Sequence, residues 1–383
     1  MLKRTPSQAT GLLATGLLAT GLLAIGLLAT ALLAAPAQAQ DPSAEFEGMV
    51  EVTEVLLDVL AIDGDGAAVR GLGKDDFIVE ENGEPVELSG VSFYTTRYGP
   101  QGEIAVEDGD VPSSRYFIFF FHDQLRTGSS IGNRLIRQQL EASRQSRRWV
   151  EEQMLPSDWV AVVSYDVKLK VQLDYSQDRY QILEAIENAS RNRDPEKNLG
   201  RQGRRLPPSG APSMLRNLPQ GKELRKQTRR IYDGIRLVAD ASAFIVGRKN
   251  MMMFTIGFGE LRNGSPIPTG DTRFYPKMEQ ALNDANVAVY TIDLTPTEFD
   301  HSQREFLSAL ASDTGGDYFG TFTNFITPLK EIAAENVGYY VLSYQSEHPA
   351  SEAGYQKVKV KTRDKKIKVR ARKGYLYGAS GDA

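Results

Sequence analysis

The side chains that could do chemistry are few, and they stand just after apolar runs of the chain. They are His122, Asp123, Ser129, Ser130 and Asp293. A serine, a histidine and a carboxylate are the groups of a hydrolase triad. The chain has three histidines, and no second one follows an apolar run in the order that a triad needs. We therefore expect neither a nucleophile elbow nor a triad, and interpret His122 as a partly buried residue at the end of a strand.

Composition excludes several other kinds of site. The chain has no cysteine, which removes disulfides, thiol nucleophiles and zinc–thiolate centres. Hydrophobic residues make up 41% of its 383 residues, and the formal net charge is −4. A chain of this length and composition is expected to bury a core and to form two domains. Its overall charge is not that of a nucleic-acid-binding protein.

The first 39 residues have the pattern of an export signal. Lys3 and Arg4 precede an uncharged apolar stretch at 11–35, and Ala37-Gln38-Ala39 supplies the small residues of a cleavage site. We therefore expect residues 1–39 to be a signal peptide and the mature protein to be secreted or periplasmic. The apolar stretch is also long enough to cross a bilayer. An uncleaved N-terminal anchor is thus the alternative, and it would be the protein's only route to a membrane.

Residues 45–98 have the pattern of a small β-sandwich-like module. Short, partly alternating apolar runs are separated by turn residues. Asn82-Gly83 is a strong hairpin signal, because both central residues of that turn need positive φ. Residues 99–114 are rich in glycine, proline and acidic residues, so we expect a linker there.

Between residues 115 and 337, apolar runs alternate with helical segments. Residues 116–121 are apolar on both faces, which is typical of a central strand in a parallel sheet. Apolar-spaced positions recur every three or four residues from Leu224 to Ile245 and predict one long amphipathic helix. Strands that alternate with helices imply right-handed crossovers. The expected fold is α/β, a doubly wound and mostly parallel sheet with the small β-module beside it.

The last segment, 338–377, returns to the two-residue period of half-buried antiparallel strands. Val358 and Val360, for example, alternate with lysines. Packing with the N-terminal β-module is one arrangement open to these strands. We interpret the lysine face as solvent-exposed surface or a guarded sheet edge.

Several segments resemble the von Willebrand factor type A fold: 115–123, 155–165 (LPSDWVAVVSY), 247–249 and 311–319 (ASDTGGDYF). More narrowly, the mature chain resembles the VWFA-related family of secreted acidobacterial proteins. That family places a module similar to 69–85 before the type A domain, and a tail similar to 340–344 and 373–375 after it. The resemblance runs from about residue 50 to 377. It implies a Rossmann-like type A domain over 115–337 and a role in protein interaction rather than catalysis.

The resemblance also implies a place for a metal. Many type A domains carry a metal-ion-dependent adhesion site. There an Asp-x-Ser-x-Ser loop, a threonine and a second aspartate offer oxygen ligands to Mg²⁺, and one position stays open for a partner's carboxylate. Here Asp123 matches the first aspartate, with Thr127 and Thr228 as further candidate ligands. Leu125 replaces a serine, and Ile256 stands where the last aspartate is expected. We expect a degenerate site without Mg²⁺, and no other cofactor.

Residues 191–220 are rich in proline, glycine and arginine without periodicity, which predicts a basic loop insert. Between residues 191 and 230 there are twelve basic and three acidic residues. A solvated, flexible insert is one interpretation. The other is contact with an anionic partner, with Arg201, Arg204 and Arg205 as candidates. The insert has no aromatic side chain to stack on bases, so specific nucleic-acid binding is not expected.

Together these features favour a secreted or periplasmic, non-enzymatic protein-interaction protein, adhesion-like, with a degenerate metal site. Two alternatives stay open: a secreted hydrolase on a Rossmann-like sheet, and an active Mg²⁺-dependent adhesin. The hydrolase would need acid, base and nucleophile groups that converge at the carboxyl ends of the strands. The adhesin would need a full set of oxygen ligands there.

Overall fold

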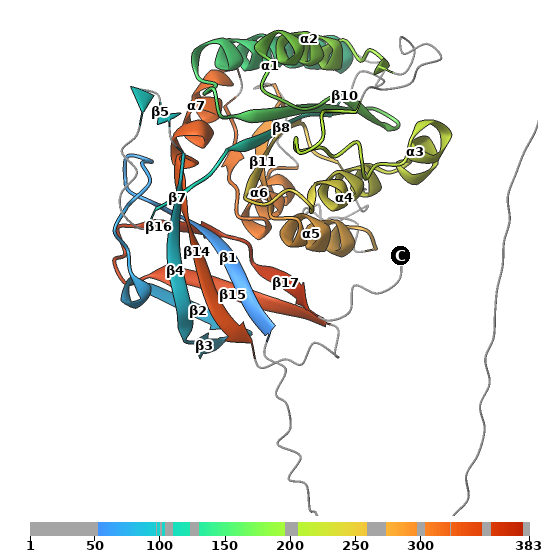
Figure 1. Cartoon of the computed structure of the whole chain (residues 1–383). Helices are drawn as coiled ribbons and strands as arrows, with labels where there is room; N and C mark the ends of the chain where they lie inside the picture. The colour runs from blue at the N-terminus through green and yellow to red at the C-terminus, as the bar shows by residue number, and fades with distance from the viewer. Residues whose placement is uncertain are drawn as a thin grey trace, which may run out of the picture. The chain divides into compact units, whose positions relative to one another are not determined.

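The computed structural model describes residues 53–96, 98–99, 102–103, 110–122, 130–195, 206–258, 273–296, 303–321, 323–346 and 354–377 (Figure 1). The expected signal peptide, residues 1–39, lies outside these ranges. Within them, no helix combines the length and the apolar character needed to cross a membrane.

The central sheet has the strand order β10-β9-β8-β11-β12-β13, which in chain order is the 3-2-1-4-5-6 arrangement of doubly wound folds. Its strands are β8 (Tyr116–His122), β9 (Trp159–Tyr165), β10 (Leu169–Ser176), β11 (Lys249–Thr255), β12 (Val287–Asp293) and β13 (Tyr318–Phe319). Neighbouring strands run parallel except β9 and β10. β11 and β12 are buried at every position, as strands covered on both faces must be. The predicted α/β class is confirmed.

Helices cover both faces of this sheet (Figure 1). On one face lie α1 (Ser130–Glu152), α2 (Arg179–Ser190) and α7 (Ile326–Glu335). On the other face lie α4 (Ile231–Ser242), α5 (Tyr275–Asp284) and α6 (Arg304–Asp313). Trp149, Ile182 and Leu329 are fully buried in the first core, and Ile235 and Leu307 in the second. The sheet is therefore the middle layer of three.

The segment predicted as one helix from Leu224 to Ile245 contains two helices instead. α3 (Gly221–Gln227) ends at Thr228, and α4 begins three residues later. The Thr228 hydroxyl donates to the Leu224 carbonyl at 2.7 Å and accepts from the Leu169 amide at 3.1 Å. The single-helix prediction is wrong because Thr228 stands at an apolar-spaced position but is polar. Its hydroxyl caps the end of α3 and also bonds to the amide of Leu169 in β10.

The second half of the predicted basic insert belongs to the core. Residues 206–220 contain no helix or strand, as expected of a loop. Met214, Leu215 and Leu218 are nevertheless buried against the face of the sheet that α4 covers. The prediction of a solvated insert is therefore wrong for this half. Its three apolar side chains follow no period, which is why the sequence pattern did not mark them.

Two mainly antiparallel sheets form the flanking module, in the orders β16-β1-β14-β4-β7 and β17-β15-β2-β3. The first holds β1 (Thr53–Ile62), β4 (Leu88–Thr95), β7 (Val111–Pro112), β14 (Gly338–Ser346) and β16 (Lys368–Ala371). The second holds β2 (Phe77–Glu81), β3 (Glu84–Val86), β15 (Gly354–Thr362) and β17 (Gly374–Tyr377). A short helix, η1 (Lys74–Asp76), precedes β2, and β5 (Tyr98–Gly99) pairs with β6 (Gly102–Glu103).

Strands from the two ends of the sequence share both sheets of the module. β14 lies between β1 and β4, and β15 pairs with β2. The two sheets enclose a common core in which Leu57, Leu342 and Tyr344 are fully buried. The predicted Asn-Gly hairpin is confirmed between β2 and β3: φ is 51° at Asn82 and 95° at Gly83.

Buried polar contacts join the module to the α/β part. The Asn286 side chain, directly before β12, donates to the Asp58 carboxylate of β1. Arg370 of β16 forms ion pairs with Glu335, at the end of α7, and with Asp317. The contact through Asn286 lies at the amino-terminal end of β12. The opposite end of the sheet is where doubly wound folds bind ligands.

Candidate functional site at the carboxyl ends of the parallel strands

Four parallel strands, β8, β9, β11 and β12, end at one edge of the sheet. β8 comes first in the chain, and the chain places β9 on one side of it and β11 on the other. The strand order thus reverses at β8, and such reversal points are where doubly wound sheets bind their ligands. We call the residues at this edge the rim: His122, Tyr165, Val167, Thr228, Arg230, residues 255–258 and Asp293.

At the centre of the rim, polar groups of β8 and β11 are bonded to each other. A hydrogen bond of 2.9 Å joins His122 Nδ1 to Thr255 Oγ1, and the Gly257 amide donates to the same oxygen at 2.9 Å. Burial lowers the pKa of His122 to about 3, so the imidazole is neutral at physiological pH. A histidine with such a pKa is a weak general base.

Both carboxylate oxygens of Asp293, at the end of β12, accept hydrogen bonds from groups of the same fold. Its carboxylate accepts from the Tyr318 hydroxyl at 2.9 Å and from the Thr295 amide at 2.8 Å, and its exposed fraction is 1%. The bond from Tyr318 links the end of β12 to β13. Asp293 is therefore a structural carboxylate.

Only one of the three candidate metal ligands, Thr228, lies among the described residues. Asp123 and Thr127 lie outside the described residues. Thr228 is fully buried and uses its hydroxyl both to donate and to accept within the fold. Ile256 follows β11 where the resemblance requires an aspartate. Among the residues that can be placed, no three His, Asp or Glu side chains form a group able to hold a metal ion.

The three arginines proposed for partner binding, Arg201, Arg204 and Arg205, also lie outside the described ranges. Their neighbours on either side are placed: Pro195 and Leu206 line a common pocket beside β10. Leu206 is half exposed at 52%. The two residues that flank this basic segment, 196–205, therefore both lie at that edge of the sheet.

A layer of aromatic rings supports the rim, and no sequence pattern marks it. The His122 ring lies 6.0 Å from Tyr165 and 5.9 Å from Phe258, measured between centroids. Tyr232 and Phe306 pack on Phe258 at 5.2 and 4.9 Å. The five rings come from five separate segments, so no local period links them. They give the rim a rigid apolar base.

Two exposed side chains lie at the surface of the rim. Val167, in the turn between β9 and β10, is 50% exposed. Arg230 stacks on Phe274 with its guanidinium 4.4 Å from the ring centroid, and pairs loosely with Asp233 at 3.6 Å. The rim thus presents one exposed aliphatic side chain and one arginine stacked on an aromatic ring, two kinds of group that occur in protein interfaces.

One short sequence motif contradicts the expectation that the chain lacks the nucleophile-elbow pattern Gly-x-Ser-x-Gly. Residues 128–132 read Gly-Ser-Ser-Ile-Gly and so match Gly-x-Ser-x-Gly. In a hydrolase the serine of this motif sits on a sharp turn between a strand and a helix. Here β8 ends at His122 and α1 begins at Ser130, with residues 123–129 between them. The motif is therefore present in the sequence, but its serine, Ser130, does not directly follow strand β8.

No protein-family model matches the chain, and no curated protein matches it. Solved structures with a similar arrangement include the conserved hypothetical protein BatB from Bacteroides thetaiotaomicron, at 16% identity and a TM-score of 0.33. The match covers 58% of this chain and 97% of BatB. The vWF domain of the type V pili tip protein Mfa5 from Porphyromonas gingivalis matches at 11% identity and a TM-score of 0.37, over 59% of this chain and 97% of that domain.

A third similar structure is proximal thread matrix protein 1 from the mussel byssus, described with a zinc-occupied MIDAS motif. It matches at 14% identity and a TM-score of 0.35, over 65% of this chain. The chain spans about half of that protein's length, 49%.

Proposed function

We propose that this chain is an exported, non-enzymatic protein-interaction protein built on a von Willebrand factor type A domain. In this proposal a protein partner binds the rim directly, without a bridging Mg²⁺. The doubly wound sheet with its strand reversal at β8 supports the location of the site. The placement in the VWFA-related family and the location outside the cytoplasm rest on the resemblance and on the leader described above.

The observation that carries the proposal is the end of β11. A metal-bridged contact needs oxygen atoms that are free to coordinate. At this central strand the Thr255 hydroxyl is bonded to His122 and Gly257, and the next side chain is Ile256. The carboxylate at the end of the neighbouring strand, Asp293, is committed to Tyr318 and Thr295. In this proposal these groups therefore support the rim and do not bind a metal.

The same geometry disfavours hydrolysis. The rim histidine, His122, is buried and neutral, with a pKa of about 3, and its Nδ1 is already bonded. Ser130 begins a helix rather than a turn that directly follows a strand. A surface made of an exposed valine, a stacked arginine and a supporting layer of aromatic rings serves recognition better than proton transfer.

The test is partner capture by the immobilised mature chain, residues 40–383, from the native envelope, with captured proteins identified by mass spectrometry. We expect EDTA to leave capture unchanged. We expect Val167→Arg to reduce capture about tenfold, because it puts a long charged side chain into the contact. Val246→Arg is the matched control: Val246 is 90% exposed but precedes β11, at the opposite end of the strands. It should capture normally.

Capture that needs Mg²⁺, or equal capture by both arginine variants, would contradict the proposal. Calorimetry with Mg²⁺ separates the adhesin alternative: sub-millimolar binding that Asp123→Ala abolishes would establish an active metal site. Ester hydrolysis by the purified chain that disappears in Ser130→Ala would establish the hydrolase.

A further inference from the structure

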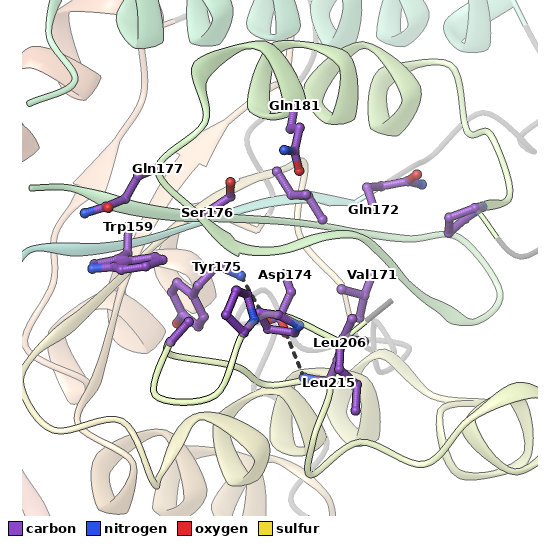
Figure 2. Close-up of a pocket in the computed structure, with 15 residues that line it drawn as sticks. Trp159, Val171, Gln172, Asp174, Tyr175, Ser176, Gln177, Gln181, Leu206 and Leu215 are labelled. Atoms are coloured by element: carbon purple, nitrogen blue, oxygen red, sulfur yellow. Dashed lines mark hydrogen bonds between the residues drawn. The ribbon is translucent and has the colours of Figure 1, made fainter. Parts of the chain in front are cut away.

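A pocket of about 490 Å³ lies beside β10, the edge strand of the central sheet, away from the rim (Figure 2). Its volume is in the range of small-ligand sites. The residues that line it come from β9, from β10 and the residue after it, from the start of α2, from Pro195 and from the loop at 206–215: Trp159, Val171, Gln172, Leu173, Asp174, Tyr175, Ser176, Gln177, Gln181, Pro195, Leu206, Pro207, Pro208, Ala211 and Leu215.

Asp174 builds this pocket by fixing the loop to the strand. Its buried carboxylate accepts from the Ser213 hydroxyl at 2.5 Å and from the amides of Met214 and Leu215 at 2.9 and 3.3 Å. Register shifts between β10 and β9 on both sides of Leu173 bend the strand here. The loop and the bent strand therefore form a fixed cavity, not a gap between mobile segments.

The described residues that line the pocket offer no charge that a ligand could pair with. Asp174 is the one charged side chain among its described lining residues, and its two oxygens are taken by the loop. The apolar part includes the indole of Trp159, which is half-buried, and the buried ring of Tyr175; Figure 2 shows them close together at one end. A charged ligand would lose its hydration without gaining a partner. These described residues favour a neutral occupant with an apolar face for the rings.

Two of the three glutamines that line the pocket, Gln172 and Gln181, use their amide nitrogen within the fold and leave their amide oxygen to a ligand. Gln172 uses its Nε2 to donate to Ser164 Oγ at 3.0 Å and to the Arg193 carbonyl at 2.8 Å. Gln181 uses its Nε2 to donate to Asp178 at 2.7 Å. No described residue donates to the Oε1 atom of either glutamine, so both oxygens are available to a ligand. A ligand with hydrogen-bond donors can pair with these oxygens, and the amide of Gln177, which also lines the pocket, offers both donors and an acceptor.

We propose that this pocket binds a neutral sugar unit. A sugar ring has an apolar C–H face that stacks on an indole such as Trp159, and hydroxyl groups that donate to amide oxygens such as those of Gln172 and Gln181. A proline-rich peptide, which also favours aromatic grooves, offers carbonyl acceptors and few N–H donors, so it does not match these oxygens. A free oligosaccharide and a glycan on a partner protein share the required chemistry.

The test uses the two tryptophans of the chain. Trp149 of α1 is fully buried in the core, whereas Trp159 lines the pocket. The mature chain is titrated with neutral trisaccharides of glucose, mannose, galactose and N-acetylglucosamine while the tryptophan emission is followed. We expect a saturable change with at least one of them, and no change in Trp159→Phe.

Two glutamine variants make the test specific. Gln181→Ala should weaken binding about fivefold, the effect of one lost hydrogen bond. Gln227→Ala is the matched control, an exposed helical glutamine that bonds to a carboxylate of its own helix at 2.9 Å, and it should bind normally. Binding of a glycoprotein with the same sugar, lost after enzymatic deglycosylation, would identify a glycan source.

The absence of saturable binding by every trisaccharide would overturn the proposal, as would a decaproline peptide that binds while the sugars do not. Equal weakening by Gln181→Ala and Gln227→Ala would also contradict it. The rim variant Val167→Arg should bind the sugar normally, so the failure of one proposal does not imply failure of the other.

Discussion

Arg115 lies directly before β8 and bonds to both carboxylate oxygens of Asp158, at 2.7 and 2.6 Å. Both side chains are almost fully buried, and a further N–H of the guanidinium donates to the Ala333 carbonyl of α7 at 2.7 Å. Removing one partner leaves the other charge buried without compensation. We predict that Arg115→Met lowers the free energy of unfolding by about 3–5 kcal/mol, measured by urea denaturation.

An exposed pair gives the control for this prediction. Arg236 and Asp240 lie one turn apart on α4, at 2.8 Å, and are 40% and 44% exposed. Arg236→Ala should change the free energy of unfolding by less than about 0.5 kcal/mol, because water screens and solvates both charges. If Arg115→Met costs no more than Arg236→Ala, the buried pair is not a source of stability.

Glu335 makes stability depend on pH. Burial raises the pKa of Glu335 to about 7; the Arg370 guanidinium opposes this rise but is shared with Asp317. The folded chain then keeps a proton that the unfolded chain, with an ordinary glutamate pKa of 4.5, has lost. This contribution to stability is complete below about pH 4.5 and disappears as the pH rises through about 7.

We predict that the free energy of unfolding of the natural chain falls between about pH 5 and pH 8 relative to that of Glu335→Gln, whose amide has no proton to lose. Urea denaturation at several pH values measures the difference between the two proteins. A difference that stays constant over this range would show that Glu335 does not titrate there.

Among the elements, the break between α3 and α4 depends on one hydroxyl. Thr228→Val keeps the volume of the side chain but leaves the buried Leu169 amide without its acceptor. We predict a loss of about 1–3 kcal/mol in the free energy of unfolding, measured by urea denaturation. Thr228→Ser keeps the hydroxyl and should recover most of this loss. Equal losses in the two variants would mean that the methyl group, not the hydrogen bond, matters.

The sequence predicts those elements whose conformation depends on the residues of the element itself. The strand at 116–122 is recognisable because burial on both faces requires an unbroken apolar run. The Asn82-Gly83 turn is recognisable because its φ values favour those two residues. The end of α3 was not predictable, because the group that Thr228 bonds belongs to Leu169, 59 residues earlier in the chain.

At the scale of the whole molecule, the fold class could be predicted and most of the site could not. The alternation of strands and helices is repeated along the chain. A wrong prediction for one helix or strand therefore does not change the predicted α/β fold class. The rim is built from loops and from rings such as Tyr165, Tyr232 and Phe258, which meet only after folding. Of the metal candidates, only Thr228 is among the placed residues, and it serves the fold.

We predict that export removes residues 1–39. Pro36 ends the apolar helix, and Ala37 and Ala39 supply the small side chains that a signal peptidase accepts. Mass spectrometry of the protein from its native envelope should therefore find Gln40 at the amino terminus. A terminus at Met1 or Leu2 would indicate the anchored form instead.

We also predict that the basic segment contributes long-range attraction to an anionic partner. Changing Arg201, Arg204 and Arg205 to serine should weaken capture at low salt and have little effect at high salt, because charges are screened over about 8 Å at physiological ionic strength. Capture at a series of salt concentrations measures this.

Three exposed arginines elsewhere form the control, changed to serine together: Arg144, Arg148 and Arg236. This control should bind normally. Equal weakening in the two triple variants would show that net charge alone, and not the position of the basic segment, governs the attraction.

The pairing of β1 with β14 affects the order in which the parts of the chain fold during synthesis and export. Thr53 faces Ser346 in this pair, so the whole α/β part lies within the loop that the pair closes. Such a high contact order makes the module slow to form on its own, whereas the α/β part can fold first and bring the two ends together. Until Gly338 has emerged during synthesis or export, β1 and β4 have no β14 between them, and their open edges are sites for aggregation. The nascent chain is therefore most vulnerable just before residues 338–346 have been added.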